Sequence, residues 1–145
     1  MILIFISLLY PLNSIAFDDA EQNEKQIPES IAPLSREEVF QAYIAEITSG
    51  YTIEPLRDHY GMNLPYQLED VKVLDAKMIY GVNGVDFIFK TQVQPFVGAH
   101  TPVGTDEFTF RISDSKIILV KYKHMESFPI HPYLKQQYKN LKPNH

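Results

Sequence analysis

Three absences limit what this chain can be. It has no cysteine, no tryptophan and no apolar run long enough to span a bilayer as a helix. Without cysteine it cannot form a disulfide scaffold, a thiolate zinc site, a cysteine nucleophile or a lipid-modified cysteine anchor. Basic residues are in the minority, 13 against 18 acidic ones, and the net charge of −5 disfavours nucleic acid as the main partner. The 145 residues suit one small soluble domain.

Known catalytic motifs are absent as well. The sequence contains no phosphate-binding glycine loop, no Gly-x-Ser-x-Gly nucleophile elbow and no His-Glu-x-x-His or His-x-x-x-His pair. Its nine tyrosines and nine phenylalanines are not accompanied by a basic groove in the middle of the chain. They are therefore typical of a core and of sheet faces, and not of a surface that stacks bases. These absences favour a protein that is not an enzyme and needs no cofactor.

The N-terminal residues indicate export. Residues 2–10 are an apolar run of nine, and Ser14-Ile15-Ala16 has the small-x-small form of a signal-peptidase site. We therefore predict a signal peptide over residues 1–16, truncated at its start because no basic residue precedes the run. The alternative is a buried N-terminal strand. Residues 17–34 are acidic and contain two prolines, which predicts a disordered leader. The mature protein would be secreted or associated with the cell envelope.

Two helices are expected next. Ser35 and Glu38 form the pattern of a capping box, and apolar residues then recur at helical spacing, which predicts an amphipathic helix over residues 36–48. A second helix is predicted over residues 52–60, with Gly61 as its left-handed C-terminal cap.

The period then changes to two. Alternating apolar residues predict strands over 71–80, 85–94, 108–112 and 116–123. Asn83-Gly84 is a strong signal for a tight hairpin turn between the first two strands. Residues 95–105 are expected to form a loop. The fold class predicted from this order is α+β, with two N-terminal helices packed on a four-stranded antiparallel meander, in a cystatin-like or NTF2-like shape.

A short amphipathic helix is predicted in the C-terminal tail. We place the α+β domain at residues 35–124 and the tail at residues 125–145. Pro132 stands near the first helical position. The apolar residues that recur along the tail are Ile130, Tyr133, Leu134, Tyr138 and Leu141. This helix is expected to dock on the sheet or on another copy of the protein. The alternative is weak contact with a membrane surface through Lys135, Lys139 and Lys142.

Several segments resemble a known family. The residues concerned are Tyr51, Leu56, Asp58, Tyr60 and Gly61, the stretch 94–102 with Gly104, and Lys123-His124. They are similar to blocks of a family of small exported bacterial proteins, domain of unknown function 3888, over about residues 36–124. The chain departs from the family pattern at Thr101, where asparagine is usual, and at His59, where tyrosine is usual. The resemblance implies export and a single compact domain, and it implies no activity.

The predicted meander brings distant side chains to one end of the sheet. The 95–105 loop shares that end with the finish of the fourth strand, so His100, His124, Tyr60 and Asp58 are expected to converge there. Four further residues are expected to shape this region, namely Gly98, Pro102, Gly104 and Gly61. The adjacent acidic pairs Glu69-Asp70 and Asp106-Glu107 face opposite ways on a strand and are interpreted as solvent-facing strand ends.

Three interpretations of this end remain open. His100 can be a structural residue that satisfies backbone groups, an anchor of a ligand or peptide site, or a general base or metal ligand. The leading hypothesis is a non-catalytic exported module that binds a peptide, an envelope component or a protein partner. The alternatives are a small metal-dependent hydrolase with a His-based site and a cystatin-like protease inhibitor.

Overall fold

The structure is a computed structural model, and it describes residues 34–81 and 84–142. Two helices begin this part of the chain. Helix α2 (Arg36–Thr48) is followed by the 3-10 turn η1 (Ser49–Tyr51) and by α3 (Ile53–Tyr60). Both helices lie where the sequence predicts them. The predicted signal peptide and all but the last residue of the predicted acidic leader lie outside the described residues.

The capping box accounts for the start of α2. The Glu38 backbone N–H donates to Ser35 Oγ at 3.2 Å, and the Ser35 N–H donates to the Glu38 carboxylate at 2.7 Å. Two amides that have no partner within the helix are satisfied in this way.

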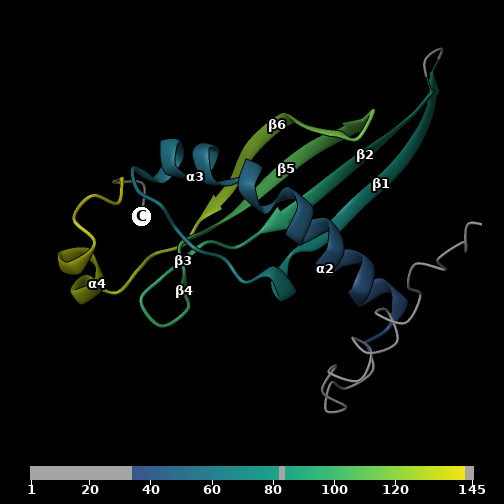
Figure 1. Cartoon of the computed structure of the whole chain (residues 1–145). Helices are drawn as coiled ribbons and strands as arrows, with labels where there is room; N and C mark the ends of the chain where they lie inside the picture. Colours follow the sequence, from purple (N-terminus) through teal and green to yellow (C-terminus); the bar gives the residue numbers. More distant parts are fainter. Residues whose placement is uncertain (1–33, 82–83, 143–145) are drawn as a thin grey trace, which may run out of the picture. The chain divides into compact units, whose positions relative to one another are not determined.

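The sheet has four antiparallel strands in the order β1-β2-β5-β6, as predicted. Strand β1 (Lys72–Gly81) pairs with β2 (Gly84–Val93), which pairs with β5 (Gly104–Ser113), which pairs with β6 (Lys116–Ser127). Figure 1 shows α2 crossing one face of this sheet, and the Phe40 and Phe89 rings meet there with centroids 6.0 Å apart. Of the predicted turn residues, Asn83 lies outside the described residues, and Gly84 has a φ of 138°.

Three details differ from the sequence prediction. Strands β5 and β6 are longer than expected, because both continue toward the end of the sheet that faces α3 and the tail. The predicted loop 95–105 contains a small hairpin of β3 (Phe96–Val97) and β4 (Thr101–Pro102). The predicted boundary at residue 124 falls inside β6, which ends at Ser127. A short 3-10 turn, η2 (Leu68–Asp70), precedes β1, and Glu69 and Asp70 are exposed there.

The two faces of the sheet have different chemistry. On the face under the helices, alternate residues of β2 and β5 are buried, namely Phe89, Thr91, Val93, Asp106, Phe108 and Phe110. The other face carries ion pairs between neighbouring strands, such as Lys90 with Glu107 at 2.6 Å and Arg111 with Asp86. One face therefore builds the core and the other meets water.

The tail completes the core. The short helix α4 (Pro132–Gln137) follows β6, and Ile130 and Leu134 are buried in the same cluster as residues of α2, α3 and the sheet. The predicted C-terminal helix is therefore present and docks on this domain. Within the described part of the chain, no helix is long and apolar enough to cross a membrane.

A pair of glycine variants tests the end of α3. Gly61 has a φ of 80°, and a Cβ there would lie 2.7 Å from the Asn140 carbonyl oxygen, whereas a Cβ at Gly50 would meet nothing within 4 Å. We expect Gly61→Ala to lower the free energy of unfolding by at least about 1 kcal/mol. Gly50→Ala is the control and should change it by less than about 0.5 kcal/mol or raise it. Urea unfolding measures both, and equal stabilities would contradict this account of the cap.

Candidate functional site

Helix α3 holds one tyrosine in the core at its C-terminal end. Leu56 and Tyr60 are four residues apart and both are buried. Gly61 ends the helix, and its N–H donates to the Arg57 carbonyl at 2.8 Å. The Lys142 N–H donates to the Tyr60 carbonyl at 3.0 Å, so the C-terminal segment covers this end of the helix. The Tyr60 hydroxyl is thereby fixed against β5.

The Asp106 carboxylate lies at the centre of a buried polar network. The Tyr60 hydroxyl donates to Oδ2 at 2.6 Å, and the Tyr122 hydroxyl donates to Oδ1 at 2.7 Å. His124 Nδ1 lies 2.9 Å from Oδ1. Asp106 is 0% exposed. A carboxylate is tolerated in such a place only when hydrogen bonds replace its water, and these three partners from α3 and β6 do so.

The direction of these hydrogen bonds follows from the two phenols. Burial raises the pKa of Tyr60, and the hydrogen bond to Asp106 raises it further. The same two causes raise the pKa of Tyr122. Both phenols therefore keep their protons and donate hydrogen bonds to Asp106. The Nδ1 atom that faces the same carboxylate carries the imidazole proton, so in neutral His124 the Nε2 atom is the acceptor.

Ser127 contacts this second imidazole nitrogen. Its Oγ lies 2.8 Å from His124 Nε2. Residues three apart on a regular strand face opposite sides of a sheet. Here the pairing shifts between Thr105, which faces Glu126, and Asp106, which faces His124, so that Met125 is an extra residue in β6. This β-bulge turns the side chain of Ser127 to the face of His124.

We call the five residues of this network the Asp106 cluster, and they are Tyr60, Asp106, Tyr122, His124 and Ser127. Its neighbours are tightly packed. A Cβ at Gly104 would lie 2.5 Å from the Tyr60 hydroxyl and 3.0 Å from His124 Cε1, so only glycine fits there. The His59 ring stacks on the His124 ring with centroids 4.1 Å apart. These contacts hold the imidazole in one orientation.

The structure brings together two of the four predicted ligand-binding residues. The Tyr60 hydroxyl lies 3.4 Å from His124 Nδ1. Asp58 is exposed, and its backbone carbonyl accepts a hydrogen bond from Lys142 Nζ. His100 is exposed in the turn between β3 and β4, with a φ of 61°, and its ring packs against Phe96 at 4.6 Å.

The four residues predicted to shape this end have defined places. Gly61 caps α3, and Gly104 begins β5 against Tyr60. Gly98 has a φ of 56°, and its N–H donates to the Tyr138 hydroxyl at 3.0 Å, which links the β3–β4 turn to the tail. Pro102 lies in β4.

The prediction that Asp106 is a solvent-facing strand end is wrong. Asp106 and Glu107 do face opposite ways, but Asp106 faces the core and only Glu107 faces the outer side, where it pairs with Lys90. The signal was present in the sequence, because Asp106 continues the alternation of Phe108 and Phe110. An acidic residue in phase with two buried aromatic residues indicates a buried carboxylate.

Sequence reasoning also missed Tyr122 and Ser127. Tyr122 faces Phe108 across the pairing of β5 with β6, and its hydroxyl reaches diagonally to Asp106. The position of Tyr122 in the alternation of its strand could have indicated that its side chain lies on the same face as the core. Ser127 carries no such signal, because its orientation depends on the β-bulge at Met125.

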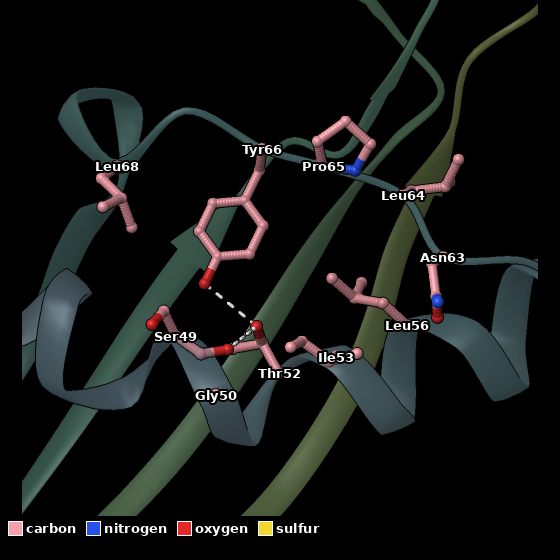
Figure 2. Close-up of a pocket in the computed structure, with 10 residues that line it drawn as sticks. All are labelled: Ser49, Gly50, Thr52, Ile53, Leu56, Asn63, Leu64, Pro65, Tyr66 and Leu68. Atoms are coloured by element: carbon pink, nitrogen blue, oxygen red, sulfur yellow. Dashed lines mark hydrogen bonds between the residues drawn. The ribbon is translucent and has the colours of Figure 1, made fainter.

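A second feature is an open pocket of about 500 Å³ between α3 and the segment 63–68 (Figure 2). Its lining is mainly apolar and includes Ile53, Leu56, Leu64, Pro65 and Leu68. The remaining lining residues are Ser49, Gly50, Thr52, Asn63 and Tyr66.

A short relay of hydroxyl groups lines this pocket. Thr52 Oγ1 donates to the Ser49 carbonyl at 2.7 Å, and the Tyr66 hydroxyl lies 3.0 Å from Thr52 Oγ1. Since the Thr52 proton is used, Tyr66 donates to Thr52 (Figure 2). Burial raises the pKa of Tyr66, which keeps its proton in place. The Tyr66 oxygen can then accept a hydrogen bond from a ligand.

The fold and the polar network place the chain in a broad structural class. Among residues 34–81 and 84–142, no group of three or more His, Asp or Glu side chains could hold a metal ion. The chain is an α+β protein with two helices before a four-stranded antiparallel sheet and a short helix after it, and its buried polar network lies at one end of that sheet.

The chain belongs to a family described as "Protein of unknown function (DUF3888)", whose sequence model matches residues 43–126, more than half of its length. This confirms the resemblance to this family, while export stays a prediction. The matched region contains the Asp106 cluster except Ser127, which lies one residue beyond it. No curated protein matches the chain, and no solved structure does.

Replacement of Tyr60 by phenylalanine tests the buried network. Above about pH 10 the unfolded chain loses the Tyr60 proton while the native state keeps it, so the free energy of unfolding falls as pH rises. Tyr60→Phe removes this contribution, and its stability should fall less steeply with pH, by up to about 1.4 kcal/mol per pH unit. Its stability at neutral pH should be lower than that of the wild type, because Asp106 loses a donor.

Urea unfolding between about pH 8 and pH 11.5 measures both slopes. Tyr80→Phe is the matched control, since the Tyr80 side chain is 75% exposed and solvent surrounds its hydroxyl in either state. Equal slopes for Tyr60→Phe and the wild type would show that Tyr60 does not keep its proton in the native state.

Proposed function

We propose that the protein is a binding module that holds a peptide by one large apolar side chain in the pocket of Figure 2. The observation that carries the proposal is the combination, in one pocket, of apolar walls with a hydroxyl oxygen that can accept a hydrogen bond. A peptide supplies both matching groups, an apolar side chain and a backbone N–H. The volume, about 500 Å³, falls within the range of about 300–1,000 Å³ that ligand pockets have.

The lining residues divide into a floor and a rim. Leu56 and Leu64 are 1% and 8% exposed, so the packing of the domain already holds them in place. Ile53 is 52% exposed at the rim. A ligand that covers Ile53 removes apolar surface from water, which stabilises the complex by about 25 cal/mol per Å². Tyr66 also orients the ligand, because a ligand N–H must point at the Tyr66 oxygen to form a hydrogen bond with it.

This pocket is not the place that the sequence predicts for the ligand. The residues predicted to bind, His100, His124, Tyr60 and Asp58, do not line it. The two places share α3, since Leu56 lines the pocket and Tyr60 belongs to the Asp106 cluster one turn later. Export to the cell envelope or beyond stays a prediction that rests on residues 1–16. The prediction that the bound peptide is extracytoplasmic rests on the same residues.

The other functions predicted from the sequence have less support. A metal-dependent hydrolase has no ligand set that can be assigned among the described residues. A protease inhibitor with a cystatin-like shape stays an alternative, in which loops and not the pocket would make the contacts. Contact of the basic tail with a membrane surface also stays a prediction.

A minimal peptide probe tests the binding proposal. We expect N-acetyl-phenylalaninamide, which has one apolar side chain and peptide N–H groups, to shift the amide resonances of Gly50, Leu56 and Asn63 at millimolar concentration. N-acetyl-serinamide has the same backbone groups without the apolar side chain, so it should shift them far less. Two-dimensional amide NMR titrations of the full chain give both dissociation constants.

Two variants with a similar starting exposure serve as test and control. Ile53→Asp places a charge in the apolar wall and should weaken binding of the phenylalanine compound at least about fivefold. Ile118→Asp changes an isoleucine that is 49% exposed on β6, outside the pocket, and should bind as the wild type does. Equal shifts with the two compounds, or equal binding by the two variants, would overturn the proposal.

A further inference from the structure

Three side chains of the Asp106 cluster form a line from the core to the surface. Asp106 Oδ1 lies 2.9 Å from His124 Nδ1, and His124 Nε2 lies 2.8 Å from Ser127 Oγ. The Asp106 side chain is 0% exposed, whereas the His124 side chain is 20% exposed and Ser127 is partly exposed. The order carboxylate, imidazole, hydroxyl is the arrangement in which a serine is activated for attack on a carbonyl group.

We propose that Ser127 is a nucleophile, activated by His124, that accepts acyl groups from carboxylic esters. The position of the protons fits this role. Asp106 accepts from Nδ1 and so fixes the imidazole tautomer in which Nε2 has its lone pair directed at Ser127. The Ser127 hydroxyl can therefore give its proton to Nε2 when the oxygen attacks.

Packing of the core accounts for only part of the arrangement. The hydroxyls of Tyr60 and Tyr122 and the Nδ1 atom of His124 satisfy the buried carboxylate, and Ser127 is not needed for that purpose. Ser127 reaches the imidazole only because the strand contains an extra residue at Met125. β-Bulges are over-represented next to active sites, where they redirect one side chain.

The contacts around the imidazole favour a fixed base. The His59 ring stacks on one side of His124, with an interplanar angle of 28°, and Gly104 lies close to Cε1. A general base is effective when it is held within hydrogen-bond distance of the proton that it removes. The distance of 2.8 Å from Nε2 to Ser127 Oγ meets this condition before any substrate binds.

The proposed step is ordinary acyl transfer. Ser127 Oγ attacks the ester carbonyl carbon, a new C–O bond forms, and the serine proton moves to His124 Nε2. The ester C–O bond then breaks, and the alcohol leaves with the proton from Nε2. Water completes the cycle by the same steps, releasing the carboxylic acid and restoring the Ser127 hydroxyl. Asp106 acts as a positioning residue, because it contacts the imidazole and not the substrate.

A fluorophosphonate probe tests the nucleophile directly. Its phosphorus forms a bond to an activated serine oxygen, the P–F bond breaks and fluoride leaves, so each reaction adds one stable mass to the protein. We expect the full chain to gain one adduct, located at Ser127 by peptide mapping, and Ser127→Ala to gain none. Ser113→Ala is the control and should react as the wild type does, because the Ser113 hydroxyl pairs with the Asp86 carboxylate and not with an imidazole.

Further variants separate catalysis from structure. His124→Ala should react at least about 100-fold more slowly, and added imidazole should restore part of the rate, which a purely structural loss would not allow. Asp106→Asn should slow the reaction through the wrong tautomer, and it is compared only at equal folded fraction by circular dichroism. Release of p-nitrophenol from p-nitrophenyl acetate should follow the same order among the variants.

The contradicting results are equally definite. A wild-type chain that gains no adduct, an adduct on another residue, or a His124→Ala rate equal to that of the wild type would overturn the proposal. The test is separate from that of the peptide pocket, because Ser127 does not line it and Ser127→Ala should bind N-acetyl-phenylalaninamide unchanged.

Discussion

The structure depends on one buried carboxylate and on the donors that surround it. Asp106 connects α3, β5 and β6, since its three partners are Tyr60 on the helix and Tyr122 and His124 on the last strand. Each partner contributes to the stability of the native fold, because an unsatisfied buried acceptor typically costs about 1–3 kcal/mol, and more when the group is charged. The helix position and the strand register are therefore tied to the same few atoms.

Much of the fold could be predicted because its signals are local. The capping box of Ser35 and Glu38, the left-handed Gly61 and the apolar periodicity lie within a few residues of the elements that they define. The strand order followed from the short connections between strands. The β3–β4 hairpin was not predicted, because strands of two residues, one of them containing Pro102, have no periodicity to detect.

The candidate site was harder to predict because its contacts join distant residues. Tyr60 and His124 were expected at one end of the sheet, and they do lie in contact. Asp106 was misinterpreted because its charge was given more weight than its phase in the strand. Ser127 could not be found from the sequence, since a bulge in the pairing decides which way it faces. The Thr52–Tyr66 contact also depends on a reversal of the chain after Gly61.

One short helix, α3, supplies residues both to the peptide pocket and to the Asp106 cluster. Leu56 supplies part of the pocket wall, and Tyr60, one turn later, supplies a donor to the buried carboxylate. The ends of α3 are fixed by different segments, since Thr52 lies against Tyr66 and the Tyr60 carbonyl against Lys142.

The core has a consequence for biosynthesis, because Ala45 and Leu134 belong to the same cluster although about ninety residues separate them. A ribosome releases the first long before the second, so this domain can complete its core only once translation has passed Leu134.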